Sequence, residues 1–112
     1  LTVARHWSAN YPWAVQVRNA LKIGLGEDVI DAINDRIALP TDDARENLVH
    51  KMANELLANQ GLSDASYAEA EAALTTDELV TVIARIGSFS MTCCTANAFD
   101  ITTPEEAPAR LR

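Results

Sequence analysis

Residues 8–24, SANYPWAVQVRNALKIG, decide the fold, because they hold a helix stop, a helix start and one uninterrupted apolar stripe. Tyr11 precedes a proline, which disfavours the α region for Tyr11, whereas Pro12 suits the first position of a helix. A helix is therefore predicted from Pro12 onward, ending at Gly24 and the Leu25–Gly26 pair. Its apolar residues follow the spacing of one helix face: Trp13, Val17, Ala20, Leu21 and Gly24.

The sequence on both sides of this stretch predicts further helices. Residues 1–7 are interpreted as the end of a helix. Residues 27–34 are predicted to form a short helix with an acidic first turn, which suits the positive end of the helix dipole, and with Val29, Ile30 and Ile33 inward. Thr41 is expected to cap the next helix, which ends near Gln60–Gly61. That helix has the clearest apolar seam of the chain: Leu48, Val49, Met52, Ala53, Leu56 and Leu57.

Ser63 and Thr75 stand where helix caps are expected. Ser63 is predicted to begin a helix over 64–74. Thr75 and Glu78, three residues apart, have the pattern of a capping box, in which each residue satisfies an N–H group at the start of the helix. The inward residues expected for the first of these two helices are Tyr67, Ala70 and Leu74.

The last predicted helix, over 77–99, is apolar nearly all round, so we expect it at the centre of the domain or in a subunit interface. Residues 100–112 contain two prolines and are expected to be extended and poorly ordered. The pattern predicts a single all-α domain, 1–112, of about six helices with a helical core over 1–99. Leu1 opens inside an apolar pattern without a cap, so we expect that further residues precede it.

The charge balance restricts the partners of the chain. Its 112 residues include 9 Lys and Arg against 16 Asp and Glu, a net charge of −7. Such a surface repels phosphate backbones and anionic lipids, so nucleic acid and membrane are not expected partners. The hydrophobic fraction of 48% is ordinary for a soluble globular protein, and only four Gly and four Pro favour helix.

The two cysteines, Cys93 and Cys94, are adjacent, which is not the pattern of a disulfide framework. We expect a reducing compartment, the cytoplasm, because no signal peptide and no run of about 18 apolar residues is present. Core packing is favoured over a redox role for both thiols. Without further ligands at suitable spacing, no metal and no cofactor is expected.

Three polar positions are candidates for chemistry. His6 is either a general base at the mouth of a cleft or a helix-end residue beside the aromatic Trp7, and the second interpretation is preferred. Gln16 lies beside the apolar stripe and either aims its amide at a ligand or bonds to backbone. His50 shares a helix face with Glu46, a spacing that suits a metal pair but is more typical of a solvated surface.

Several segments occur in an order that is similar to a known family. These are Tyr11-Pro12-Trp13-Ala14-Val15-Gln16-Val17-Arg18-Asn19-Ala20 with Gly24-Leu25, the helix of residues 46–57, Leu62-Ser63-Asp64-x-x-Tyr67, Glu78-Leu79-Val80 and Asn97-Ala98-Phe99. In this order and spacing, which covers nearly the whole chain, the sequence resembles the carboxymuconolactone decarboxylase and alkyl hydroperoxidase D-like superfamily.

The resemblance implies an all-α fold, a trimer or hexamer, and an active site near the start of the Trp13 helix. Peroxidase members of that family have Cys-x-x-Cys with a His four residues later and an upstream Glu. In this sequence the two cysteine positions correspond to Ala9 and Pro12 and the His position to Gln16, while the Glu would precede Leu1. Thiol peroxidation needs both an attacking and a resolving thiol, so this activity is not expected here.

Two functional hypotheses follow. The first is an enzyme acting on a small organic acid, lactone or related carbonyl compound, in which Gln16 binds the carbonyl, Tyr11 and Trp13 shape the pocket, and His6 or a residue before Leu1 moves protons. It predicts an enclosed apolar pocket beside Gln16, and a pocket filled by tryptophans would contradict it. The second is a non-catalytic oligomeric binding or assembly protein, and a thiol-based peroxidase is a weaker alternative.

Overall fold

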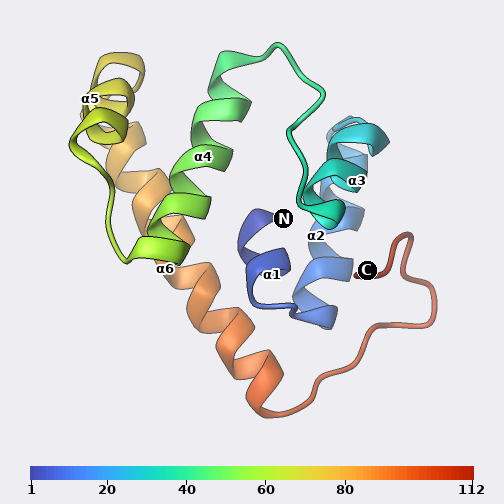
Figure 1. The fold of residues 1–112 in the computed structure, drawn as a ribbon. Coiled ribbons are helices and arrows are strands. Elements are labelled where there is room, and N and C mark those ends of the chain that lie inside the picture. The colour runs from blue at the N-terminus through green and yellow to red at the C-terminus, as the bar shows by residue number, and fades with distance from the viewer.

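The chain folds into six α-helices without a strand (Figure 1), as the sequence predicts. The computed structural model describes all residues, 1–112. The helices, in chain order, are α1 (Thr2–His6), α2 (Asn10–Lys22), α3 (Glu27–Asp35), α4 (Ala44–Asn59), α5 (Asp64–Ala73) and α6 (Thr76–Ala98). In Figure 1, α6 runs along one side of the molecule, beside α5 and α4 at one end and α1 and α2 towards the other.

The break between α1 and α2 lies earlier than the sequence predicts. Ser8 adopts a left-handed conformation with φ of 49°, and α2 begins at Asn10. Tyr11 is helical, so its predicted exclusion from the α region is wrong. Pro12 fits the first turn of α2 because N–H groups there have no partner within the helix. The first bond of α2 runs from the Trp13 N–H to the Ala9 carbonyl, at 2.9 Å.

The end of α2 follows the predicted turn at glycine. Gly24 has a φ of 84°, a left-handed conformation that a side chain would oppose. The Leu25 N–H then bonds to the Ala20 carbonyl at 3.0 Å, and the Gly24 N–H bonds to the Leu21 carbonyl at 3.1 Å. These bonds satisfy carbonyl groups at the helix end, in the Schellman arrangement.

The caps of the later helices agree with the sequence except at α4. Its cap is Asp43, whose carboxylate accepts hydrogen bonds from the N–H groups of Arg45 and Glu46, so the prediction of Thr41 is wrong. A carboxylate is favoured there because it also interacts with the helix dipole. The predicted caps of α5 and α6 are confirmed: Ser63 accepts from the Ser66 N–H, and Thr75 accepts from the Glu78 N–H.

Two apolar clusters form the core. The larger joins α1, α2, α3 and α6, with Ala53 of α4, around the fully buried Trp13, and it includes the predicted inward residues Val29, Ile30 and Ile33. The smaller joins α4, α5 and α6: Leu48, Met52, Ala70, Leu74 and Leu79. Tyr67 was expected inside, but it is 48% exposed. The neighbouring Ser66 is buried instead, and its hydroxyl donates a 2.5 Å hydrogen bond to Glu55.

The helix α6 buries only one of its faces. Leu79, Ile86 and Cys93 recur at intervals of seven residues and lie in the core, whereas Met91 on the outer side is 68% exposed. By length and composition alone α6 is also apolar enough to cross a membrane, a test that core helices of soluble proteins pass as well. One such helix is weak evidence for a membrane span.

The segment after α6 is irregular but hydrogen-bonded to α3, which differs from the poorly ordered tail expected. The buried Asn34 side chain donates to the Arg110 carbonyl at 2.8 Å and accepts from the Arg112 N–H at 3.0 Å. The Arg112 guanidinium also forms ion pairs with Asp31 and Asp35. The segment is held to α3 because the buried amide of Asn34 needs hydrogen-bond partners, and the main chain of Arg110 and Arg112 supplies them.

Candidate functional site

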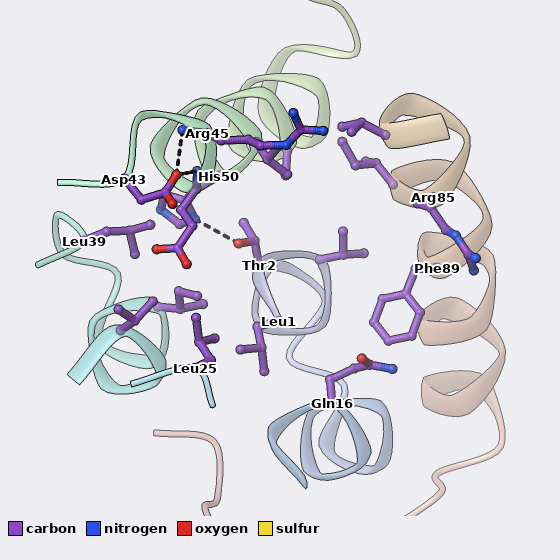
Figure 2. Close-up of a pocket in the computed structure, with 18 of the residues that line it drawn as sticks. Leu1, Thr2, Gln16, Leu25, Leu39, Asp43, Arg45, His50, Arg85 and Phe89 are labelled. Atoms are coloured by element: carbon purple, nitrogen blue, oxygen red, sulfur yellow. Dashed lines mark hydrogen bonds between the residues drawn. The ribbon is translucent and has the colours of Figure 1, made fainter. Parts of the chain in front are cut away.

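A cavity of about 700 Å³ lies between α1, α2, α3, α4 and α6 (Figure 2). Apolar side chains form most of its wall: Leu1, Val3, Leu25, Val29, Ile33, Leu39, Val49, Ala53, Val82, Ile86 and Phe89. The remaining lining residues are polar or charged: Thr2, Gln16, Asp43, Arg45, Glu46, His50, Thr81, Arg85 and Ser88. An apolar cavity with a few polar groups is the usual form of a site for a small molecule.

Gln16 lies on this cavity, as the enzyme hypothesis requires. It is half-buried on α2, and Figure 2 shows its amide beside Phe89 of α6. Neither Trp7 nor Trp13 fills the space, since neither is among the lining residues. A neutral amide at an apolar wall can polarise a carbonyl or bind a carboxylate, but it cannot titrate.

The two aromatic residues expected to shape the pocket lie elsewhere. Trp13 is completely buried in the core, and its indole N–H has no hydrogen-bond partner. Tyr11 is 43% exposed, on the first turn of α2. Neither residue lines the cavity, so its shape depends on aliphatic side chains and on Phe89.

His6 is not brought together with Gln16. It is exposed at the end of α1, with the edge of its ring towards Trp7 at a centroid distance of 6.4 Å. It lines a separate depression and not the cavity that contains Gln16. The positions where the resembling family has its cysteines, Ala9 and Pro12, are both buried.

His50 is the residue that sequence reasoning missed. The expectation of a surface position is wrong, since His50 is half-buried and lines the cavity, with Nδ1 2.8 Å from Thr2 Oγ1 (Figure 2) and Nε2 3.0 Å from Asn54 Nδ2. Burial lowers its pKa below the ordinary value. No local signal could reveal this, because Thr2 and His50 are 48 residues apart.

The tautomer of His50 decides what Thr2 can do. When Asn54 donates through its amide nitrogen, Nε2 accepts, and the neutral ring donates its Nδ1 proton to the Thr2 oxygen. The Thr2 hydroxyl is then free to donate to a ligand. When the Asn54 amide is turned, Nε2 carries the proton and Nδ1 accepts the proton of Thr2. The pair is therefore able to give or take a proton at the cavity wall.

Neither cysteine belongs to the cavity. Cys93 is buried as expected, and burial raises the pKa of its thiol to about 11. Cys94 is exposed, so the prediction of core packing is wrong for this residue. Their helix turns them to different sides of α6, because neighbouring residues of a helix are rotated by about 100°. No group of three or more His, Cys, Asp or Glu side chains is arranged to hold a metal ion.

Comparison with known proteins found no relative. No protein-family model matches the sequence, and no match was found among curated proteins or solved structures.

Proposed function

We propose that this chain is a divergent, cytoplasmic member of the carboxymuconolactone decarboxylase and alkyl hydroperoxidase D-like superfamily. In this proposal it binds a small organic acid, lactone or related carbonyl compound and moves a proton on it, without a redox cysteine pair. The order of six helices and the sequence from Tyr11 to Gly24 support the family. The buried Ala9 and Pro12 favour a chemistry that uses no thiol at these positions.

One observation supports the binding function most strongly, namely the apolar cavity beside Gln16. Its volume of about 700 Å³ falls within the roughly 300–1,000 Å³ of small-molecule sites. An apolar wall takes up the hydrocarbon part of a ligand, and Gln16 provides the hydrogen-bond donor for a carbonyl oxygen. Loss of surface water around the ligand strengthens that hydrogen bond.

In this proposal Thr2 and His50 carry out the proton transfer to and from the ligand. Figure 2 shows Gln16 and His50 on opposite sides of the cavity, so a ligand that contacts both must extend across it. The lowered pKa of His50 keeps the imidazole neutral near pH 7, which is the form that accepts a proton. Thr2 relays the proton between the ligand and Nδ1, because its hydroxyl both donates and accepts.

Binding is tested with a medium-chain γ-lactone and its ring-opened hydroxy acid, followed by NMR chemical-shift changes. Val49→Phe places a ring in the cavity wall and is expected to weaken binding by about tenfold or more. The matched control is Ile23→Phe, an exposed position after α2 that lies outside both the cavity and α6. Equal binding by both variants, or shifts confined to residues away from the cavity, would contradict the proposal.

Proton transfer is tested separately, by exchange of the protons beside the lactone carbonyl in D₂O. The wild-type protein is expected to accelerate exchange over buffer, and His50→Gln to lose that acceleration. Loss of exchange in His6→Gln with exchange retained in His50→Gln would contradict the role of His50 and assign the proton to His6. Lactone binding without any proton exchange would contradict the proposed proton transfer and leave only the binding function.

A second candidate function, self-assembly, is favoured by an exposed stripe on α6. Successive residues of this stripe are separated alternately by four and three positions, which is the spacing of a coiled-coil seam. They are apolar or small, and all of them are exposed: Val80, Ala84, Gly87, Met91, Cys94 and Ala98. Small side chains allow two helices to approach closely, so we propose that α6 packs against another copy of the chain in a trimer or hexamer.

The assembly is tested by molar mass from light scattering during gel filtration. Met91→Glu places a charge in the middle of the stripe and is expected to convert the oligomer to monomer. Thr92→Glu introduces the same charge at an exposed position beside the stripe and is expected to keep the oligomer. A monomeric wild-type protein, or the same mass for both variants, would contradict the proposed interface.

A further inference from the structure

A second depression, of about 430 Å³, adjoins the wall of the apolar cavity. Thr2, Ile33 and His50 line both hollows, so these three residues separate them. The depression is formed by α1, the end of α3 and the following turn, and α4. Asn54 lines this depression only, which places the Nε2 side of the His50 ring towards it.

The charge of this depression is opposite to that of the whole chain. Arg5 and Arg36 line it together with the imidazole rings of His6 and His50, and no carboxylate does. The chain as a whole carries a net charge of −7. A concave surface of one sign concentrates ions of the other sign, because its low-dielectric walls focus the field. The depression therefore favours an anion on a protein that otherwise repels anions.

Arg5 is fixed in position by main-chain oxygens. Its Nε donates to the Asn34 carbonyl at 2.7 Å, and its Nη2 donates to the Arg112 carbonyl at 2.8 Å. The carboxylate near it, Asp35, already accepts two hydrogen bonds from the Arg112 guanidinium. The positive charge of Arg5 is thus held in place without a hydrogen bond to a carboxylate side chain. A guanidinium has five N–H donors, so donors remain for a ligand.

Arg36 adds a positive charge, and both Arg36 and His6 add hydrogen-bond donors that the fold does not use. Arg36 takes part in none of the four ion pairs and makes no side-chain hydrogen bond. It ends α3 in the left-handed conformation, with φ of 59°, a position that glycine or asparagine usually occupies. His6 has no side-chain hydrogen bond either. Two effects lower the pKa of Arg5: partial burial is the larger, and the positive charge of Arg36 is the second. Arg36 and Arg5 therefore lie close enough to act on the same anion.

We propose that this depression binds a small oxyanion with the charge of a phosphate group, held by Arg5, Arg36 and His6. A phosphate group carries about −1.5 to −2 charges at pH 7 and offers three acceptor oxygens, which matches the cluster of donors. Arginine is suited to this role because its planar fork bonds two oxygens at once. The site is distinct from the apolar cavity and does not depend on the function proposed for it, since Arg36 does not line that cavity.

The experiment is calorimetric titration of the full chain with inorganic phosphate at pH 7 and constant ionic strength. Saturable binding of one phosphate per chain is expected. Arg36→Gln is expected to weaken binding by about tenfold, the loss of one charge-assisted hydrogen bond. Arg18→Gln removes the same charge from an exposed position on α2 that lines neither hollow, and is expected to change the affinity by less than about twofold.

The outcomes separate site binding from general charge effects. No saturable binding of phosphate would overturn the proposal, as would equal weakening by Arg18→Gln and Arg36→Gln. Acetate serves as a second probe, and binding of acetate as tight as that of phosphate would overturn the preference for a dianion. Thermal unfolding followed by circular dichroism shows that both variants are folded before titration. Lactone binding in the apolar cavity is expected to be unchanged in Arg36→Gln.

Discussion

The hydroxyl oxygen of Thr2 lies 2.8 Å from Nδ1 of His50, and this contact joins α1 to α4 across 48 residues of sequence. It places a titratable ring in a wall that is otherwise largely aliphatic. Because the same two residues line both the apolar cavity and the basic depression, a change in either residue affects both surfaces.

The pH dependence of stability should report the burial of His50. Burial lowers the pKa of His50 below 6.5, the ordinary value expected in the unfolded chain. The unfolded chain therefore binds the proton more readily, so the contribution of His50 is complete above pH 6.5 and is lost as the pH falls through the folded-state pKa. Urea unfolding from about pH 7.5 to 5 should show a smaller loss of stability in His50→Gln than in wild type. Parallel curves would contradict this.

The Thr2 hydroxyl should contribute to stability through the same bond. Thr2→Val keeps the shape of the side chain but leaves the half-buried Nδ1 of His50 without its partner. The expected cost is about 1 kcal/mol in the free energy of unfolding, measured with urea. Thr2→Ser keeps the hydroxyl and serves as the control. A Thr2→Val variant as stable as wild type would contradict this contribution of the hydrogen bond.

The two cysteines should differ strongly in reactivity. With a pKa of about 11, roughly one Cys93 thiol in ten thousand is ionised at pH 7, and its side chain is buried. Cys94 is exposed. In the monomeric Met91→Glu variant a chromogenic disulfide reagent is therefore expected to modify one thiol rapidly and the second only after unfolding, and adding Cys94→Ala should remove the rapid phase. A rapid phase that persists in Cys94→Ala would show that Cys93 is accessible.

Asn34 should hold the C-terminal segment to α3. Asn34→Ala removes both hydrogen bonds to the main chain of Arg110 and Arg112, and the expected loss is about 1–3 kcal/mol in the free energy of unfolding. Limited proteolysis should cut the segment after α6 faster in this variant. Asn19→Ala, an exposed position on α2, is the control and is expected to stay within about 0.5 kcal/mol. Equal proteolysis of both variants would contradict the contact.

Local signals in the sequence predicted most of the fold. The capping residues Ser63 and Thr75, the turn at Gly24 and the periodic apolar faces depend on neighbours within a few residues, so they are readable without a structure. Two errors of this kind have local explanations. Asp43 competes with Thr41 as a cap and wins through its charge, and Tyr67 is displaced outward by the buried bond between Ser66 and Glu55.

The candidate site was predicted only in part. The sequence left two interpretations of Gln16 open, and the structure shows its side chain on the cavity wall, where its position beside the stripe of α2 directs it. His6 and Tyr11 could not be placed, since their orientation depends on where Ser8 turns the chain. The prediction of a surface position for His50 was wrong because its helix face is typical of a solvated surface, whereas the fold packs Thr2 of α1 against it.

By itself the sequence determined six helices, their approximate ends and the apolar face of most of them, because these follow from interactions within one or two turns. Only the tertiary structure decided that the space beside Gln16 is open, that His50 lines both hollows whereas Arg36 lines only the second, and that Asn34 binds the main chain at Arg112, 78 residues away. The physical reason is that helical periodicity fixes the direction in which a side chain points. The crossing of the helices fixes what that side chain meets.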